Sequence, residues 1–237
     1  MSNVIGSGLL GRSFRSLALP GALYFCSGVS DSKETRASEF NRERELLLSV
    51  CEETQTFSSF VYFSSIMAPD RANKYFEHKY NMEELVRSLF PEKYLIVRLP
   101  QVVGMVKNTT LFPELVRRIH GGLPVLVQRN ATRSLIDIDD VVRITNKLIE
   151  VGARGLEINC IPDETLSVSD IVDFISDEIG CPADRVCVDE GVAQDADSRL
   201  MRQYLCEEDP VLLPGYTRFV VSKYAKKLID DEARKPT

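Results

Sequence analysis

The feature that most constrains the fold is the glycine-rich turn in the stretch NVIGSGLLGRSF, residues 3–14. A short apolar run leads into its three glycines, Gly6, Gly8 and Gly11, and a helix-like segment follows. In the order strand, G-x-G-x-x-G, helix, the glycines permit a tight turn and a close backbone approach to a phosphate, which the helix N-terminus favours electrostatically. The stretch therefore predicts a turn that binds the pyrophosphate of a dinucleotide, the alternative being a tight strand–helix turn without a ligand.

In the segment that follows, as far as Gly104, short apolar runs alternate with amphipathic stretches, which is typical of a parallel sheet with helical connections. Short apolar runs are expected as strands, and the stretches between them as amphipathic helices. Within one of these stretches Phe40, Leu47 and Cys51 recur at helical spacing, so one face of it should be buried. The expected strands are 3–6, 22–27, 59–64 and 94–98, and the expected helices are 9–18, 36–54 and 74–90.

Beyond Gly104 the pattern is less regular. Ser167 or Ser169 is suited to cap a helix that Gly180 ends, because serine accepts from free backbone N–H groups and glycine adopts left-handed backbone. A solvated helix, SKYAKKLIDDEARK, is expected near the C-terminus. Other expected elements are a helix at 110–120 and strands at 124–128 and in GLEINC. We divide the chain into 1–104 and 105–237, with some elements of the second part returning to the first.

Composition limits the partners. The net charge of −6 argues against nucleic acid or an anionic membrane as the main partner. No apolar run approaches the roughly 20 residues of a membrane span, and no cleavable signal is expected. The 6 cysteines are scattered without a C-x-x-C, which is typical of reduced thiols in a cytoplasmic protein. With 2 histidines in the chain, no metal site is expected.

A second motif is YFEHK, in which Tyr75 and Lys79 stand four residues apart on an expected helix. Residues at this spacing share a helix face, and a nearby cation lowers the pKa of a tyrosine so that it can exchange protons near neutrality. Ser64 and Ser65 end the preceding strand, at the sheet edge where open α/β folds bind ligands. Together these residues predict a group that polarises a carbonyl and relays a proton, although Tyr-x-x-x-Lys alone is also common on surface helices.

The order of these motifs resembles the extended short-chain dehydrogenases/reductases, the family of NAD-dependent epimerases and dehydratases. VYFSSIMAP is similar to the strand that carries the family's catalytic serine or threonine. IVRLPQVVG is similar to the R-x-x-x-V-x-G segment beside the nicotinamide, and NATRSLIDIDDVV to the block whose arginine meets a nucleotide-sugar diphosphate. GLEINCIPDETLSVSDIVDFI is similar to the stretch that follows in the family. The resemblance implies an α/β fold with a Rossmann-like parallel sheet and a small C-terminal substrate-binding lobe.

The resemblance also implies roles for single residues. Tyr75 would be the general acid/base, and Lys79 would lower its pKa and bind the nicotinamide ribose. Ser65 would hydrogen-bond the substrate oxygen, with Ser64 as the alternative if the register shifts by one. Contacts to NAD or NADP would come from Gly6, Gly8, Leu9, Leu10 and Gly11, from Ser27 and Gly28, from Lys79, and from Pro100 and Val102.

For the substrate, the resemblance implies that Arg133 contacts the diphosphate of a nucleotide sugar. Asn108 falls where the family often has a diphosphate-binding asparagine. Asp139 and Asp140 are interpreted as helix-capping and packing residues rather than catalytic ones. A homodimer through the helices at 36–54 and 74–90 is also expected from the family.

The chain departs from the family at its start. The family normally has G-x-x-G-x-x-G, followed by two further strands, before the strand that leads to the first long helix. In one reading, ALYFCSGVSDS stands for the family's fourth strand, so that the second and third strands and their ribose-binding acid are missing. In the other, ALYFCS is the second strand and Asp31, 20 residues past Gly11, is that acid. We favour the first reading. Arg12 would then either bind the 2′-phosphate of NADP or be a solvated arginine in the first turn of the helix.

The favoured reading has a topological consequence. If the chain passes directly from the first strand to the family's fourth, the next strand is added on the opposite side of the first strand from the family's second strand. Because strand–helix–strand crossovers are almost always right-handed, the first helix should change face or be too short to count.

We expect an NAD(P)-dependent reductase or epimerase acting on a nucleotide-activated sugar. The alternative is a nucleotide-sugar binding protein of the same fold with weak cofactor binding or none. A dehydratase is disfavoured because Ile66 and Met67, rather than acids, follow Ser65.

Overall fold

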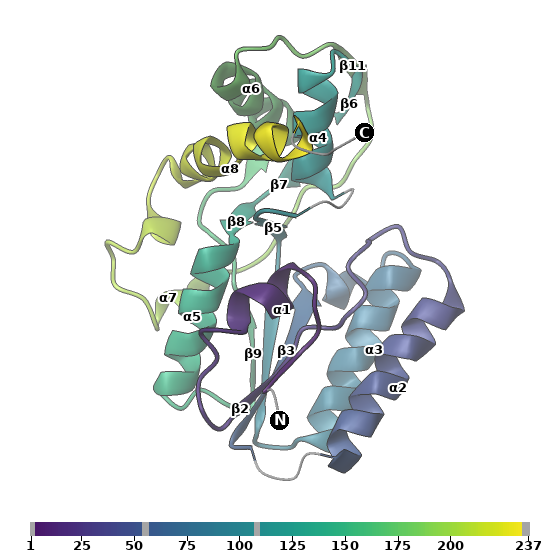
Figure 1. Ribbon diagram of the computed structural model, residues 1–237, viewed down its shortest axis with the longest axis vertical. Coiled ribbons are helices and arrows are strands. Elements are labelled where there is room, and N and C mark those ends of the chain that lie inside the picture. Colours follow the sequence, from purple (N-terminus) through teal and green to yellow (C-terminus); the bar gives the residue numbers. More distant parts are fainter. Residues whose placement is uncertain (1–2, 54–56, 107–109, 234–237) are drawn as a thin grey trace. The chain divides into compact units, whose positions relative to one another are not determined.

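The computed structural model describes residues 3–53, 57–106 and 110–233, and the chain divides into two compact units (Figure 1). The first unit contains the chain up to Leu99, together with Ile138–Cys160 and Arg199–Tyr204. The second contains Pro100–Asp137, Ile161–Ser198 and the chain from Leu205 onward. Among the described helices, none is long and apolar enough to cross a membrane.

A five-stranded parallel sheet, in the order β1-β2-β3-β4-β9, forms the centre of the first unit. The predicted apolar runs form these strands, so the α/β class and the parallel sheet are confirmed. The first two strands are shorter than expected. Their bounds are β1 Val4–Ile5, β2 Ala22–Phe25, β3 Ser59–Ser65, β4 Tyr94–Leu99 and β9 Leu156–Asn159.

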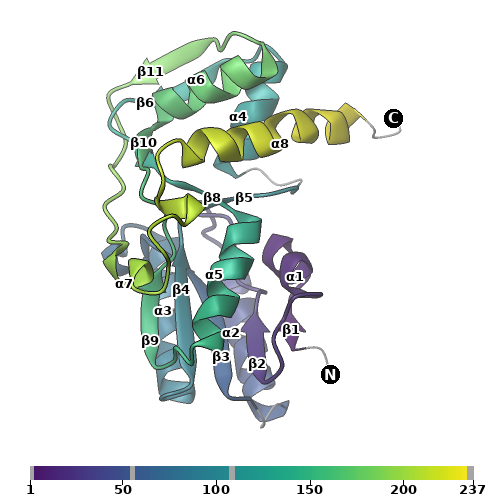
Figure 2. The same ribbon diagram turned by 90° about the vertical axis from the view of Figure 1, so that its left-hand side faces the viewer.

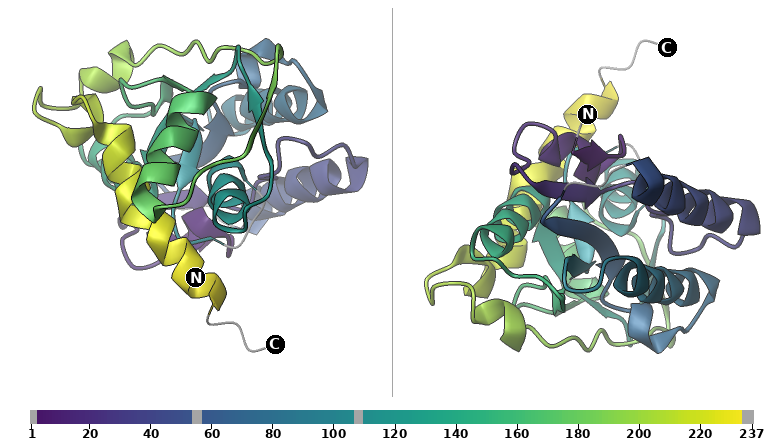
Figure 3. Two further views of the ribbon diagram at one scale, coloured as in Figure 1. Left: turned by 90° about the horizontal axis from the view of Figure 1, so that it is seen from above. Right: turned by 90° about the horizontal axis from the view of Figure 1, so that it is seen from below.

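Helices cover both faces of this sheet (Figures 2 and 3). On one face lie α2 (Ala37–Glu53) and α3 (Lys74–Leu89), whose apolar residues pack with alternate residues of the strands. On the other lie α1 (Leu9–Phe14) and α5 (Ile138–Glu150), which contact one another. The ring of Phe14 lies 4.8 Å from that of Tyr24 and 5.2 Å from that of Phe63. The first core comprises Leu23, Phe25, Leu47, Val50, Phe60, Tyr62, Met82, Val86, Phe90 and Ile96.

The position of β2 decides between the two readings of the N-terminal segment. In the order 3-2-1-4-5-6, the second and fourth strands lie on opposite sides of the first. Here β2 lies between β1 and β3, the strand that ends in Ser64 and Ser65, which is the place of the fourth strand. The first reading is therefore confirmed, and the assignment of Asp31 as the ribose-binding acid is wrong.

The first helix remains on the face it would have if the two strands were present. The steps from β1 to β2 and from β2 to β3 run in the same direction, but α1 and α2 lie on opposite faces of the sheet. The two crossovers therefore have opposite hands, and the one through α1 is the exception among right-handed connections. With 6 residues in α1 and 2 in β1, this connection is short enough for the rule to have little force.

Helix α3 is capped at its start and is joined to the sheet through its second half. At its start the side chain of Asn73 accepts a hydrogen bond from the Phe76 amide at 2.9 Å, as an N-cap does. Further along, the fully buried Glu83 accepts two hydrogen bonds from Arg98 of β4, at 2.9 and 2.6 Å. Because such paired, hydrogen-bonded charges are directional, they hold the register of α3 against β4.

In the second unit, α4 (Leu111–His120), α6 (Val168–Ile179) and α8 (Tyr216–Ala233) pack together (Figure 2). Ser167 caps α6 and Gly180 ends it in left-handed backbone, as predicted. The expectation of a solvated C-terminal helix is wrong, because α8 begins earlier and buries Val220, Val221, Tyr224 and Leu228. Three strand pairs complete the unit: β5 (Gln101–Val103) with β8 (Leu135–Asp137), β6 (Val125–Gln128) with β11 (Arg185–Val188), and β7 (Thr132–Arg133) with β10 (Leu166–Ser167).

Candidate active site

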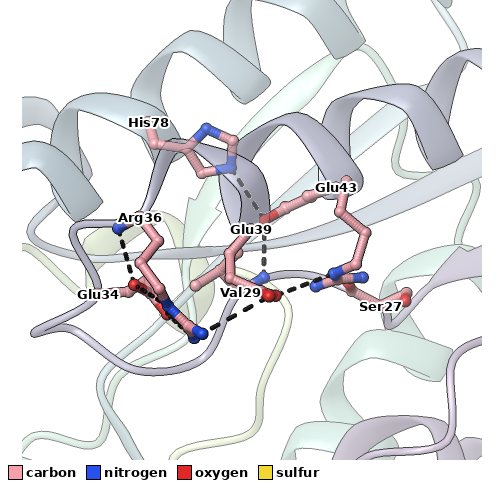
Figure 4. A network of polar contacts seen from close by, with 8 residues as sticks. Ser27, Val29, Glu34, Arg36, Glu39, Glu43 and His78 are labelled. Atoms are coloured by element: carbon pink, nitrogen blue, oxygen red, sulfur yellow. Dashed lines mark hydrogen bonds and ion pairs between the residues drawn. The ribbon is translucent and has the colours of Figure 1, made fainter.

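A buried carboxylate, Glu43, is bound to the predicted catalytic lysine. The Lys79 ammonium lies 3.1 Å from Glu43 Oε1 and 3.3 Å from the Tyr62 hydroxyl, and 3 % of the lysine is exposed. Tyr62 donates to the same Oε1 at 2.7 Å. The second oxygen, Oε2, accepts from the Val29 amide at 2.7 Å and contacts His78 Nε2 at 3.0 Å (Figure 4). Glu43 thus connects α2 with α3, β3 and the loop after β2.

The charge of Glu43 is strongly favoured despite complete burial. Burial raises the pKa of this carboxyl, but the Lys79 ammonium, His78 and the Val29 amide outweigh it and hold the pKa at about 2. A carboxylate with this many donors is satisfied on both oxygens. Glu43 is therefore ionised throughout the physiological range.

Tyr75 lies one helical turn before Lys79, and 8 % of its surface is exposed. Burial raises the pKa of this phenol well above its ordinary value, and the charges of Glu43 and Asp31 raise it further. The pKa shift is opposite to the one expected from the sequence, because burial of the phenol is its largest cause and the charge of Glu43 adds to it. Tyr75 is accordingly protonated at neutral pH.

The two serines at the end of β3 differ in environment. Side chains alternate along a strand, so Ser64 lies on the same face as Tyr62, towards α2 and α3, and Ser65 on the other. The Ser64 hydroxyl is buried and has no hydrogen-bond partner. Ser65 Oγ accepts from the Met67 amide at 3.3 Å. An unpartnered buried hydroxyl has a free donor and acceptors, which leaves Ser64 available to a ligand.

The glycine-rich turn is closely packed at two of its glycines and open at the third. A Cβ atom on Gly6 would lie 2.6 Å from the backbone of Cys26, and one on Gly11 would lie 2.3 Å from the Gly6 carbonyl oxygen. Gly8 has φ −68°, and a Cβ there would meet nothing within 4 Å. Packing within the chain therefore explains Gly6 and Gly11 but not Gly8.

The remaining residues expected around this turn also belong to the first unit. Leu9 and Leu10 begin α1, and the loop after β2 contains Ser27 and Gly28. A Cβ on Gly28 would lie 2.5 Å from the Lys79 ammonium nitrogen and 3.0 Å from Glu43 Oε1, so a side chain there would displace the buried ion pair. Arg42 of α2 reaches the Ser27 carbonyl at 3.5 Å and also pairs with Glu39, beside the Glu34–Arg36 pair (Figure 4).

Other residues predicted for the site belong to the second unit. Pro100 directly precedes β5, and Val102 lies within it. Arg133 of β7 donates to the carbonyl oxygens of Thr132, at 2.6 Å, and Val192, at 3.0 Å. Burial lowers the pKa of this guanidinium. Among the described residues no carboxylate pairs with Arg133, so its charge is available to an anionic ligand. Asn108 lies outside the described residues.

Glu43 is the functional residue that the sequence analysis missed. It occupies a core position of α2, in the apolar series Phe40, Glu43, Leu47 and Val50. A charged residue at a helical core position requires a buried partner, and this pattern was the available signal. The partner itself is 36 residues away in the sequence and could not be read from it. No group of His, Cys, Asp or Glu suited to hold a metal ion occurs among the described residues.

Comparison with known proteins places this geometry in a family. A family model described as NAD dependent epimerase/dehydratase matches residues 20–160, which is more than half of the chain. The chain belongs to the NAD-dependent epimerase/dehydratase family. The match begins after the glycine-rich turn, which agrees with the abbreviated start of the sheet.

Solved structures support the same fold. UDP-glucuronic acid 4-epimerase from Bacillus cereus, in complex with UDP-glucuronic acid and NAD, is 16% identical with a TM-score of 0.71, over 94% of this chain and 79% of that one. UDP-N-acetylglucosamine 4-epimerase from Methanobrevibacter ruminantium is 14% identical with a TM-score of 0.72, over 96% and 83%. RMD from Pseudomonas aeruginosa, complexed with NADPH, is 16% identical with a TM-score of 0.69, over 94% and 88%. No curated protein sequence matches the chain significantly.

Proposed function

We propose that the chain is an NAD(P)-dependent reductase or epimerase acting on a nucleotide-activated sugar. The proposal is carried by the buried Tyr75 and Lys79 of α3 and by the buried, unpartnered hydroxyl of Ser64 near the carboxyl end of β3. Ligands bind at this edge of open parallel sheets. The family, and the neighbours crystallised with NAD, NADPH or a UDP-sugar, support the same chemistry.

The residues present fit a dinucleotide at the turn and at the nicotinamide end. At Gly8 a side chain would meet no other part of the described chain, so packing does not explain the glycine there. Gly8 would leave room for a phosphate, which the turn would bind together with Gly6, Leu9, Leu10 and Gly11. Ser27, Gly28 and Lys79 would hold the nicotinamide half, with Pro100 and Val102 also in contact. When bound, the nicotinamide supplies or accepts the hydride. The strands that carry the family's adenine-ribose acid are missing, so the affinity should be weaker than in longer members.

Tyr75 would supply the proton. Because its pKa is raised, it carries the proton at neutral pH and acts as a general acid towards a carbonyl oxygen. This direction favours reduction of a keto sugar. Ser64, the alternative to Ser65 and the serine on the sheet face that α3 covers, would donate a hydrogen bond to the same oxygen and hold it beside Tyr75. Lys79 would orient the nicotinamide ribose rather than activate Tyr75 by its charge.

Arg133 would bind the substrate diphosphate. Its guanidinium is half-buried and has no carboxylate partner among the described residues. A planar guanidinium can bind a diphosphate with two hydrogen bonds. Asn108 would add a contact. We also propose a homodimer through 36–54 and 74–90 and a cytoplasmic location, which size-exclusion chromatography with light scattering and cell fractionation would test.

A non-catalytic nucleotide-sugar binding protein is the second candidate. It is favoured by one observation, the loss of the two strands that carry half of the cofactor site. Mass spectrometry of co-purifying nucleotides, followed by an assay of NADH and NADPH oxidation with 4-keto nucleotide sugars, separates the candidates. Turnover supports the enzyme. A bound nucleotide sugar with no turnover under either cofactor supports the binding protein.

A further inference from the structure

The feature that the proposed chemistry does not use is Glu43 itself. It is fully buried, yet its carboxylate is contacted by four groups from three parts of the first unit. These are the Val29 amide of the loop after β2, the Tyr62 hydroxyl of β3, and His78 and Lys79 of α3. A buried ion pair costs desolvation of both charges, so stability alone is a weak reason to retain one.

The arrangement gives Glu43 control over two elements of the active site. Its Oε1 contacts the Lys79 ammonium, which also donates to the Tyr62 hydroxyl at 3.3 Å. Its Oε2 holds the Val29 amide, which follows directly on Gly28, the residue that covers the ammonium. One side chain of α2 therefore fixes both the lysine and the loop above it. The charged and titratable groups facing this cluster are His78, Tyr62 and Tyr75, with Asp31 acting on Tyr75.

We propose that Glu43 is a positioning residue that keeps the Lys79 ammonium charged and fixed beneath Gly28. This inference rests on the proposed function, because the position of Lys79 matters to catalysis only where a cofactor ribose binds. Glu43 itself reaches neither substrate nor cofactor. Without its charge, the buried ammonium would retain only neutral polar contacts and would release its proton at lower pH.

The test compares two substitutions of the same side chain. Glu43→Gln keeps the shape and removes the charge, whereas Glu43→Asp keeps the charge and withdraws it by one methylene. Glu45→Gln, at an exposed position of the same helix, is the matched control. The first readout is NMR of ¹³C-labelled lysine in the cofactor-free protein, with the Lys79 signal assigned from Lys79→Arg. The second is the pH profile of kcat/KM for NADPH-dependent reduction.

In Glu43→Gln the Lys79 signal should titrate at lower pH than in the wild type. The kcat/KM profile should gain a descending alkaline limb, with a loss of about tenfold at its alkaline end. In Glu43→Asp the lysine titration should stay close to that of the wild type while kcat/KM falls about tenfold at all pH values, because the ammonium is displaced. Glu45→Gln should match the wild type in both.

An unchanged lysine titration in Glu43→Gln, or wild-type kcat/KM in Glu43→Asp, would overturn the proposal. If Glu43→Gln does not fold, Glu43→Asp still decides the positional claim. Tyr62→Phe removes the neutral hydroxyl that contacts Glu43 and Lys79 but keeps the charge of Glu43, so it separates loss of that hydroxyl from loss of the charge. A shifted lysine titration in a protein that turns over no substrate would refute the proposed function instead. The failure of the inference and that of the function are therefore distinguishable.

Discussion

Two regions of the first unit differ in how firmly buried contacts hold them. On the α3 side, the proposed catalytic helix is held by two buried ion pairs, Glu43–Lys79 and Glu83–Arg98. At the opposite edge of the sheet, β1 has 2 residues and α1 has 6, and the connection between β1 and β2 has the exceptional hand. There Arg12 and Arg15 donate only to the carbonyl oxygens of the turn.

This difference means that the groups proposed for proton transfer and those proposed for dinucleotide affinity lie in regions of different order. Proton transfer needs groups held within a fraction of an ångström, and the α3 side supplies that order through directional buried contacts. Dinucleotide affinity depends on contacts along the whole ligand, and the abbreviated edge lacks the strands that would contact the adenosine half. We therefore expect the proposed catalytic residues to be held in place and the cofactor affinity to be low.

The largest expected effect is on turnover. Tyr75→Phe removes the proposed proton donor and should lower kcat about 10²- to 10⁴-fold with nucleotide-sugar binding retained, because general acid catalysis contributes about that much. Tyr80→Phe on the same helix is the control, since the ring that Arg71 covers is kept. Steady-state reduction kinetics measure both, and unchanged turnover in Tyr75→Phe would remove this residue from the mechanism.

Next is the anchoring of α3. Glu83→Gln leaves the buried part of Arg98 without its principal carboxylate, so the free energy of unfolding should fall by about 3 kcal/mol. Glu84→Gln, at a side chain that is 56% exposed, should change it by less than about 1 kcal/mol. Urea unfolding compares the two. Equal effects would mean that the buried pair does not hold α3 more firmly than a surface pair does.

The glycine-rich turn gives the third comparison. Gly11→Ala should destabilise the fold, because its Cβ would lie 2.3 Å from a backbone oxygen that has little room to move. Gly8→Ala should leave the free energy of unfolding within about 0.5 kcal/mol, as a surface substitution does. It should nevertheless weaken NADH or NADPH binding, because the new methyl group occupies the approach of the phosphate. Thermal melts and fluorescence titrations test both, and unchanged affinity in Gly8→Ala would argue for a turn without a ligand.

The last comparison is a pH dependence of stability. The pKa of Glu43 is lowered from 4.5 to about 2 in the folded chain, so its contribution is complete above 4.5 and is lost as the pH falls towards 2. Wild type should therefore lose more stability across this window than Glu43→Gln, which has no carboxyl to protonate there. Parallel acid-induced losses in the two proteins, followed by circular dichroism, would contradict the assignment.

The sequence was most informative where local pattern and motif order agree. The strands before and after α3, the cap and end of α6, and the family follow from short segments read in order. The long-range partners do not. Glu43 and Lys79 come together only through the packing of α2 on α3, and the burial that reverses the expected pKa shift of Tyr75 also arises only in the folded chain. The buried face of α8 was not predicted because the segment is rich in charged residues. Val220, Val221 and Tyr224 nevertheless share a helical face, and that face is buried.

The central claim is that the abbreviated turn still binds a nicotinamide dinucleotide. Titration of the protein with NADH and with NADPH, followed by nicotinamide fluorescence, tests it most directly, with Gly8→Ala as the comparison. We predict saturable binding of at least one of the two below millimolar concentration, weakened in Gly8→Ala. Absence of binding of both at millimolar concentration would contradict the account and leave the nucleotide-sugar binding protein as the function.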